Sequence, residues 1–378
     1  MKFTVARDVL AEAVNWTART VPTRPSVPIL AGIRMTAQDG TLALSSFDYE
    51  ISTRSEVEAD IAQDGEVLVS GRLLASITKA LPNQPVECSL EGAKLNVICG
   101  TSHFTLASMS VDEYPLLPQI PRIRGSVDAQ VLAQAISQVS VAASSDDTIP
   151  LLTGVRMEIE DDKITLLGTD RYRLAMREFS WEPEEPGIST ALLVKARTLG
   201  DVAKSMTSAG RVEIAFDADI ESQPNSLIGF AAGNRRTTST LMDGDYPPVR
   251  RLFPEETSIQ AVVDRYELLD AVKRVSLVAE QKTSVRLGFA DERLVLEAGQ
   301  DDNAQASEVV GAKQSGGDIQ TAFNPRYLES GLSVLDTDYV RFSFTDPAKP
   351  AVITGQKEET GGEDLRFRYL IMPIRFGI

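Results

Sequence analysis

Few residues of this chain could carry acid–base, nucleophilic or metal chemistry. His103 is the only histidine, so the chain cannot build a multi-histidine metal site or a His-Glu-x-x-His zinc motif. It lies between strand-like residues, and we expect a structural role for it. Cys88 and Cys99 are the only cysteines. Both fall in alternating sequence of the kind found in strands, which favours buried, reduced thiols over a disulfide or a metal site.

Phosphate-binding and hydrolytic motifs are missing as well. The sequence has no Gly-x-x-x-x-Gly-Lys-Ser/Thr loop, no Gly-x-Gly-x-x-Gly and no Gly-x-Ser-x-Gly. Asp48 and Asp170 are related by an internal repeat, and we expect each to bond the backbone amides of its own turn rather than to join a carboxylate pair. The sequence therefore predicts a protein that is not an enzyme and that has no cofactor and no metal site.

An internal duplication organises the chain. Residues 28–35 (PILAGIRM) return 122 positions later as residues 150–157 (PLLTGVRM). The same offset relates Val9 to Val131. A period of this length is too long for a stacked solenoid repeat and long enough for each copy to be a domain with its own core.

A fainter third copy follows the first two. Leu268 stands 136 residues after Leu132, whereas residues 285–287 stand 130 after residues 155–157, so the third copy is about six residues shorter. Together the three copies account for the whole chain. We therefore expect three tandem homologous domains, with the boundaries 1–122, 123–256 and 257–378.

Each copy repeats one order of elements. Two segments per copy have apolar residues at helical spacing, and alternating, strand-like sequence surrounds them. Helices this short need a sheet to cover their apolar stripes. The fold class expected is α+β, with two helices on one side of antiparallel sheets in each domain. The predicted helices are 7–19, 71–81, 127–144, 195–206, 264–280 and 325–335.

Charge is divided unevenly between these helices and the rest of the chain. The formal net charge is −16, which by itself argues against binding to nucleic acid. The six predicted helices nevertheless sum to +2, which leaves −18 for everything outside them. One interpretation is that the helical cations only keep exposed helix faces hydrated. The other is that they contact phosphates weakly, while the acidic rest of the protein repels nucleic acid. The pattern permits contact with DNA without requiring it.

The overall composition is that of a globular protein. Hydrophobic residues make up 43% and charged residues 24% of the chain, enough apolar material for substantial cores. Charged residues interrupt the N-terminal sequence before an apolar signal region can build. No stretch approaches the roughly 18 uncharged apolar residues of a membrane span. We expect a cytoplasmic protein without a membrane partner.

Five segments, in order along all three copies, resemble the bacterial DNA polymerase sliding clamp, the beta subunit of DNA polymerase III. Each segment alone is a weak motif, but five in order on a triplicated chain are specific. They are residues 27–30 (VPIL), 169–175 (TDRYRLA), 243–248 (DGDYPP), 323–328 (FNPRYL) and 369–376 (YLIMPIRF).

This resemblance implies a head-to-tail homodimer whose six similar domains close a ring, with the helices on the inner face and the sheets outside. Such a ring would be a processivity factor that encircles double-stranded DNA without regard to its sequence. The implied partners are the catalytic subunit of DNA polymerase III, the clamp loader, and other polymerases and repair proteins that carry clamp-binding motifs.

The resemblance also implies a hydrophobic pocket for partner peptides between the second and third domains. Where a glycine and a histidine are commoner in the proteobacterial pattern of the family, this chain has Arg171 and Tyr172, two larger side chains that affect the width of the pocket. Carried over position by position, the pocket comprises Leu152, Thr169, Arg171, Tyr172, Arg173, Leu174, Pro247, Arg251, Leu252, Leu370, Ile371, Met372, Pro373, Ile374 and Arg375.

For contact with DNA we expect a smaller set of cations, one in the proline-rich loop and four on helices. They are Arg24, Arg72, Lys79, Arg197 and Lys204. Two other functions compete with the clamp. An enzyme built from the same repeats would need the catalytic groups that are missing here. A protein-interaction scaffold that never meets DNA would keep the peptide pocket but would not need cationic helices.

Overall fold

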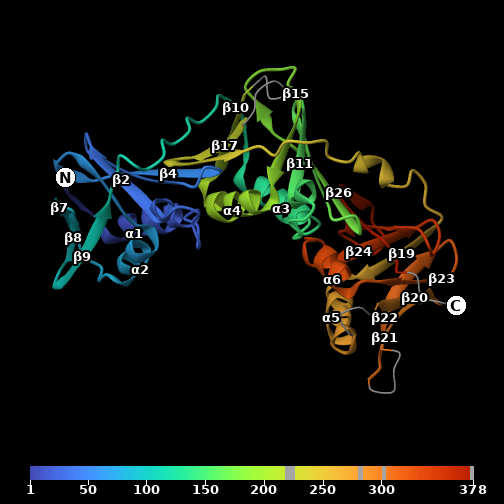
Figure 1. The fold of residues 1–378 in the computed structure, drawn as a ribbon. Coiled ribbons are helices and arrows are strands. Elements are labelled where there is room, and N and C mark those ends of the chain that lie inside the picture. Colours follow the sequence, from blue (N-terminus) through green and yellow to red (C-terminus); the bar gives the residue numbers. More distant parts are fainter. Residues whose placement is uncertain (218–225, 280–283, 300–303, 375–378) are drawn as a thin grey trace. The chain divides into compact units, whose positions relative to one another are not determined.

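The computed structural model describes residues 1–217, 226–279, 284–299 and 304–374. Its chain divides into two compact units, each built on one continuous sheet (Figure 1). Unit 1 comprises Met1–Gln130, Glu182–Glu185 and Asp201–Leu241, and unit 2 comprises Val131–Trp181, Pro186–Gly200 and Met242–Ile378.

Six α-helices occur in the described ranges, and each falls on a predicted segment. Asp264 and Asn324 cap the last two, because their side chains accept hydrogen bonds from backbone amides of the first turn. In none of these ranges is a helix both long and apolar enough to cross a membrane. The helices are α1 (Arg7–Ala18), α2 (Gly71–Ala80), α3 (Ala129–Ser140), α4 (Ala196–Met206), α5 (Arg265–Val275) and α6 (Pro325–Ser333).

In the described residues, the sheet of unit 1 has fourteen strands, and all their pairings are antiparallel. Helices α1 and α2 lie side by side within this unit (Figure 1). In spatial order the strands are β14 (Glu182–Pro183), β10 (Ile123–Asp128), β16 (Arg211–Phe216), β17 (Leu227–Ala232), β18 (Arg235–Thr240), β4 (Ile51–Glu58), β3 (Thr41–Phe47), β2 (Gly32–Gln38), β6 (Gly65–Ser70), β9 (Ser102–Met109), β8 (Lys94–Cys99), β7 (Val86–Glu91), β1 (Lys2–Val5) and β5 (Asp60–Gln63).

Over the part of unit 2 that the structure describes, the sheet has twelve strands and is antiparallel as well. Helices α5 and α6 pack against each other here (Figure 1). The strands in order are β15 (Ser189–Lys195), β11 (Gly154–Glu160), β12 (Lys163–Thr169), β13 (Arg173–Ser180), β26 (Glu363–Ile371), β25 (Ala351–Gln356), β24 (Tyr339–Phe344), β19 (Ile259–Asp264), β22 (Ala306–Ser315), β21 (Arg293–Ala298), β20 (Val285–Ala290) and β23 (Ile319–Phe323).

The 122-residue repeat is visible in these bounds. Strands β2, β3 and β4 begin and end exactly one repeat before β11, β12 and β13. A short 3₁₀ turn precedes each set, η1 (Pro28–Ala31) and η2 (Pro150–Thr153). The glycine after each turn has a steric reason, because a Cβ at Gly32 would lie 2.5 Å from Leu68 Cδ1 and one at Gly154 would lie 2.8 Å from Leu193 Cδ1.

The two repeated aspartates act in turns, as expected. Asp48 Oδ1 accepts hydrogen bonds from the amides of the second and third residues after it. Asp170 Oδ1 does the same in the second copy. The residue after each aspartate, Tyr49 or Arg171, has a positive φ, of 75° and 80° respectively. Asp170 thus fixes a tight turn between β12 and β13, which brings the ends of both strands to one place.

The core of unit 1 contains both cysteines. Cys88 on β7 and Cys99 on β8 are fully buried, free thiols, which confirms the prediction made for them. Cys99 Sγ donates to the carbonyl oxygen of Pro82 at 3.3 Å. His103 is a residue of β9, paired with Ile98 of β8, and its side chain is exposed.

Candidate functional site

An apolar groove lies within unit 2, where β12, β13 and β26 end. Its volume is about 450 Å³. Residues from four parts of the chain line it: the η2 turn, the turn between β12 and β13, the segment after Tyr246, and the end of β26. The lining is Ile149, Leu151, Leu152, Thr169, Arg171, Arg173, Leu174, Pro247, Val249, Leu252, Leu370 and Met372.

Strand pairing brings these distant segments together. Strand β26 pairs with β13, so that Leu370 lies opposite Leu174 and Ile371 opposite Arg173. The backbone continues the contact beyond the strand, since the amide of Met372 donates to the carbonyl oxygen of Tyr172 at 2.9 Å. Residues nearly 200 positions apart therefore share one wall.

The floor of the groove is part of a buried apolar cluster. Leu152, Leu174, Val249 and Leu370 belong to the cluster and also line the groove. A floor held by a packed core keeps its shape without a ligand, which lowers the entropic cost of binding. Met372, by contrast, keeps 40% of its surface exposed at the rim and is available to a ligand.

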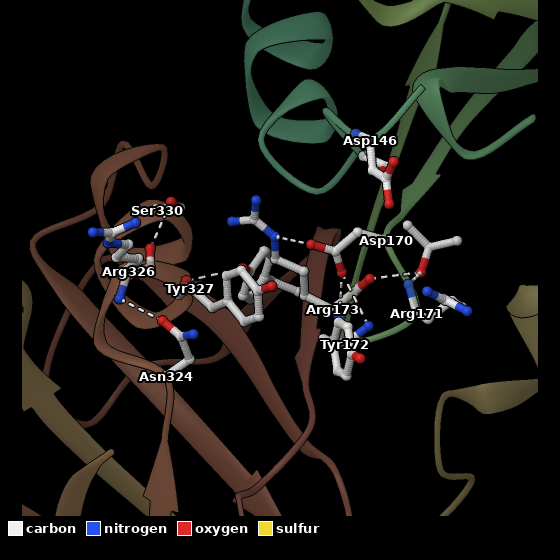
Figure 2. Close-up of polar contacts among 12 residues, drawn as sticks. Asp146, Asp170, Arg171, Tyr172, Arg173, Asn324, Arg326, Tyr327 and Ser330 are labelled. Atoms are coloured by element: carbon white, nitrogen blue, oxygen red, sulfur yellow. Dashed lines mark hydrogen bonds and ion pairs between the residues drawn. The ribbon is translucent and has the colours of Figure 1, made fainter. Parts of the chain in front are cut away.

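A polar network borders the groove (Figure 2). Arg173 Nε donates to Asp170 Oδ2 at 3.0 Å, and its guanidinium carbon lies 4.4 Å from the ring centre of Tyr327. The ring of Tyr172 stacks on the same tyrosine, with centroids 6.3 Å apart. The hydroxyl of Tyr369 donates to the carbonyl oxygen of Tyr327 at 2.8 Å. These contacts hold Arg173 in place between the β12–β13 turn and α6.

Burial, followed by the negative charge of Asp170, raises the pKa of Tyr327. Burial is also the main cause that raises the pKa of Tyr369. Both tyrosines are therefore neutral at physiological pH and act as hydrogen-bonding and stacking groups. In the residues described, no three His, Cys, Asp or Glu side chains are grouped so that they could hold a metal ion.

Of the fifteen residues predicted for the pocket, nine line the groove. Tyr172 lies beside it on Tyr327, Arg251 lines a neighbouring cavity, and Ile371 is buried on the other side of its strand. Pro373 and Ile374 are half-buried beyond the lining, with the amide of Ile374 bonded to Ala322 O. Arg375 lies outside the described residues. The nine are Leu152, Thr169, Arg171, Arg173, Leu174, Pro247, Leu252, Leu370 and Met372.

Sequence reasoning missed four residues of this site: Ile149, Leu151, Val249 and Tyr327. The first two flank Pro150 in the repeated segment, so the repeat itself was a usable signal for them. Val249 directly follows Pro247 and Pro248, so its position next to a predicted pocket residue was a signal for it. Tyr327 belongs to the segment 323–328 that carries the resemblance, but its contact with Arg173 was not predicted, because that contact depends on how α6 meets the β12–β13 turn.

The five cations predicted to face DNA are all exposed, and within the described ranges none has an ion-pair partner. Arg72 and Lys79 are seven residues apart on α2, and Arg197 and Lys204 are seven apart on α4. This spacing puts each pair on one helix face. Arg24 lies in the loop before η1.

Family models match the chain in three consecutive stretches. They describe the DNA polymerase III beta subunit, with its N-terminal domain at residues 1–118, its central domain at 126–248 and its C-terminal domain at 250–375. The chain belongs to the DNA polymerase III beta subunit family. This membership confirms the resemblance read from the sequence and the organisation in three tandem domains.

Individual members of the beta subunit family agree with this assignment. The beta sliding clamp of Streptomyces coelicolor is 52% identical over 375 residues, 99% of each chain. That of Micrococcus luteus is 53% identical over 310 residues, 82% of this chain and 98% of its own. The crystal structure of the DNA polymerase sliding clamp from Bacillus subtilis superposes with a TM-score of 0.90 at 28% sequence identity. The superposition covers 100% of this chain and 100% of that chain. These matches support a DNA polymerase processivity clamp over a scaffold that never meets DNA.

Proposed function

We propose that this sliding clamp works as a head-to-tail homodimer that encloses duplex DNA and tethers a polymerase through the apolar groove. The observation that carries the proposal concerns two strands, β9 and β22. Over most of its length, each of them pairs with a neighbouring strand on one side only. In β9, residues 102–107 pair with β8, and only Ser108 and Met109 also reach β6. In β22, residues 306–311 pair with β21, and the following residues turn to β19.

Each of these half-paired strands leaves a free edge within the described residues. Free edges attract further strands, and both edges expose a large apolar side chain: Phe104 on β9 is 38% exposed and Val309 on β22 is 61% exposed. The two edges differ in sequence, so pairing one with the other is a heterologous contact. Two copies joined in this way close on themselves, because each copy supplies one β9 edge and one β22 edge.

The DNA inside such a ring meets one cation of the loop before η1, Arg24, and four cations of helices α2 and α4: Arg72, Lys79, Arg197 and Lys204. Their exposure and their lack of ion-pair partners among the described residues support this assignment. Within the observed bounds the six helices carry a net charge of +3, so the rest of the chain carries −19. Weak contact with phosphates inside an otherwise acidic protein favours sliding over tight binding.

The groove receives short hydrophobic segments of the partners. All fifteen residues carried over from the family, including Arg375, are part of this proposal. The partners are the catalytic subunit of DNA polymerase III, the clamp loader, and other polymerases and repair proteins. A mostly apolar lining with a few convergent polar groups suits a peptide.

The remaining parts of the proposal concern the chain as a whole. We set its domain boundaries at residues 1–122, 123–256 and 257–378, a division supported by the three family stretches. The clamp acts in the cytoplasm, where bacterial DNA is replicated, and has no enzymatic activity of its own.

The decisive experiment tests enclosure. The clamp is loaded onto a nicked circular plasmid and isolated by gel filtration, and the plasmid is then cut once with a restriction enzyme. An enclosing ring stays with the circle through the column at moderate salt and leaves from the ends of the linear DNA. Equal retention on circular and linear DNA would mean ordinary binding and would overturn the proposal.

A further inference from the structure

Two ladders of paired strands join neighbouring domains of the chain. In the first seam, β4 of the N-terminal domain pairs with β18 of the central domain, and in the second seam β13 of the central domain pairs with β26 of the C-terminal domain. The first seam lies within unit 1 and the second within unit 2. Each seam has five residue pairs in register.

Backbone hydrogen bonds give the second seam no advantage over the first. Beyond the pairs in register, two further backbone bonds extend the first seam and one extends the second. These bonds are Thr240 N to Glu50 O and Glu56 N to Asn234 O in the first seam, and Met372 N to Tyr172 O in the second. A difference in stability between the seams must therefore come from their side chains.

The buried side chains of the two seams differ in kind. All six that the first seam buries carry a hydroxyl group, and two of them, Ser52 and Thr238, bond each other at 2.6 Å. Seven of the eight that the second seam buries are apolar or aromatic, with Leu174 opposite Leu370. A bond between two buried hydroxyls stabilises a fold less than two buried apolar side chains do, because both hydroxyls give up bonds to water.

Two local features weaken the first seam further. Ser55 is buried, and its hydroxyl oxygen has no hydrogen-bond partner among the described residues. Arg54 and Arg236 stand directly opposite each other and are both exposed, and like charges in this arrangement destabilise a strand pair. Arg54 Nε donates to Glu56 Oε1 at 2.8 Å, which relieves only part of this repulsion.

We propose that the first seam is a hinge within the subunit, where the chain bends when the ring opens. The inference rests on the proposed function, since only a closed ring has to open. A head-to-tail dimer that opens at one interface and stays joined at the other must change its curvature elsewhere. Of two ladders that join domains, the less stable one yields first.

The chemistry of the first seam suits repeated opening. Hydroxyl groups that leave the seam find water as a partner, whereas opening of the second seam would expose apolar side chains to water. Leu174 and Leu370 of the second seam also line the groove. A bend at the first seam therefore leaves the groove intact, so that a partner can stay bound while the ring is open.

Hydrogen exchange of the full clamp, followed by mass spectrometry, compares the two seams. Amides of β4 and β18 should exchange at least about tenfold faster than those of β13 and β26, the factor that corresponds to one buried apolar side chain. Arg236→Glu turns the like-charge pair into an opposite-charge pair and should slow exchange at the first seam about two- to fivefold. The control Arg293→Glu makes the same change in net charge on β21, opposite Gly311, and should slow nothing there.

The loss of loaded clamp from nicked circular plasmid then connects the first seam with ring opening. In the double variant Ser52→Cys, Thr238→Cys, a disulfide can form across the seam, because the native hydroxyl oxygens lie 2.6 Å apart. The variant is loaded in the reduced form and then oxidised. Oxidation should slow its loss from the circles by about fivefold or more, and a reductant should restore the native rate. Arg236→Glu should slow the loss as it slows exchange.

The outcomes separate the hinge from the proposed function. If circles do not retain the native clamp, enclosure fails and the hinge fails with it. If they do, but neither oxidation nor Arg236→Glu changes the rate of loss, enclosure stands and the hinge is wrong. Exchange at the second seam as fast as at the first would also overturn the hinge.

Discussion

Met372 projects from the rim of the groove one residue after β26 ends. A flexible, half-exposed thioether over an apolar floor can adapt to anchors of different shape. We expect Met372→Ala to weaken the binding of a partner peptide by about 1 to 2 kcal/mol, roughly five- to thirtyfold in Kd, because a large apolar contact of the site is lost. Isothermal titration calorimetry with a short synthetic peptide that carries apolar side chains measures the change.

Leu365→Ala is the control for this prediction. Leu365 lies on β26, the strand that Met372 follows, and is also exposed, but it does not line the groove. Its removal should leave the peptide affinity unchanged. Equal losses in the two variants would mean that the effect arises from β26 as a whole and not from an anchor at the rim.

Cys88 gives a prediction about reactivity. Burial raises the pKa of its thiol to about 12, so at pH 8 only about one thiol in 10⁴ is ionised. We expect the native clamp to resist a thiol reagent at pH 8 and the unfolded chain to react at both cysteines. Rapid reaction of one thiol in the native clamp, followed by absorbance, would contradict the burial.

The same pKa shift affects stability at high pH. The folded state keeps a proton that the unfolded chain loses from about pH 9 upward. The contribution of the Cys88 thiol to the free energy of unfolding is therefore complete below pH 9, and it declines as the pH rises toward 12.

At the scale of residues, the site was predicted through the resemblance to the beta subunit family, and nine of the residues carried over, among them Leu174 and Leu370, line the groove. The internal repeat by itself predicted only the turn of Asp170, which joins Thr169 to Arg173. It was harder to predict which face of a strand points toward the groove. Ile371 was included in the pocket and points into the core, because adjacent residues of a strand face opposite sides.

The helices carry the next prediction. Arg72, Lys79, Arg197 and Lys204 form two exposed pairs on α2 and α4. Changing all four to glutamine should weaken binding to a short duplex and flatten its salt dependence, by up to about 0.9 in log–log slope for each lost phosphate contact. The slope is obtained from anisotropy titrations at several salt concentrations.

A control with the same change in net charge uses four exposed cations outside the helices: Lys94, Lys163, Arg236 and Lys349. If the helices face DNA, this control should change affinity only slightly and keep the slope. The same flattening in both variants would mean that total charge, rather than helix position, sets the interaction.

At the scale of elements, the sequence predicted all six helices and the repeat of the strands. It did not predict that the strands of the central domain divide between two sheets, with β10, β16, β17 and β18 in one and β11, β12, β13 and β15 in the other. Nor did it predict that β26 pairs with β13. Periodicity reports which face of a strand is buried, but not which distant strand lies beside it.

For the molecule as a whole, closure of the ring is the property from which its function follows. An acidic chain holds DNA weakly by contact, so retention must come from topology. On our proposal, the free edges of β9 and β22 form the dimer interfaces. We expect Phe104→Glu and Val309→Glu each to lower the sedimenting mass from about twice 41.1 kDa to that of one chain, because each change enters both interfaces of a head-to-tail dimer.

Mixing the two variants distinguishes a head-to-tail dimer from a symmetric one. In the mixture, β9 of the Val309→Glu chain and β22 of the Phe104→Glu chain are both native, so one interface of a mixed dimer is intact while the other carries both changes. We expect sedimentation of the equimolar mixture to recover dimers that neither variant forms alone. These dimers should be open, and the enclosure assay should find them no longer retained on circular DNA. If β9 paired with β9 instead, Val309→Glu would remain dimeric alone and mixing would rescue nothing.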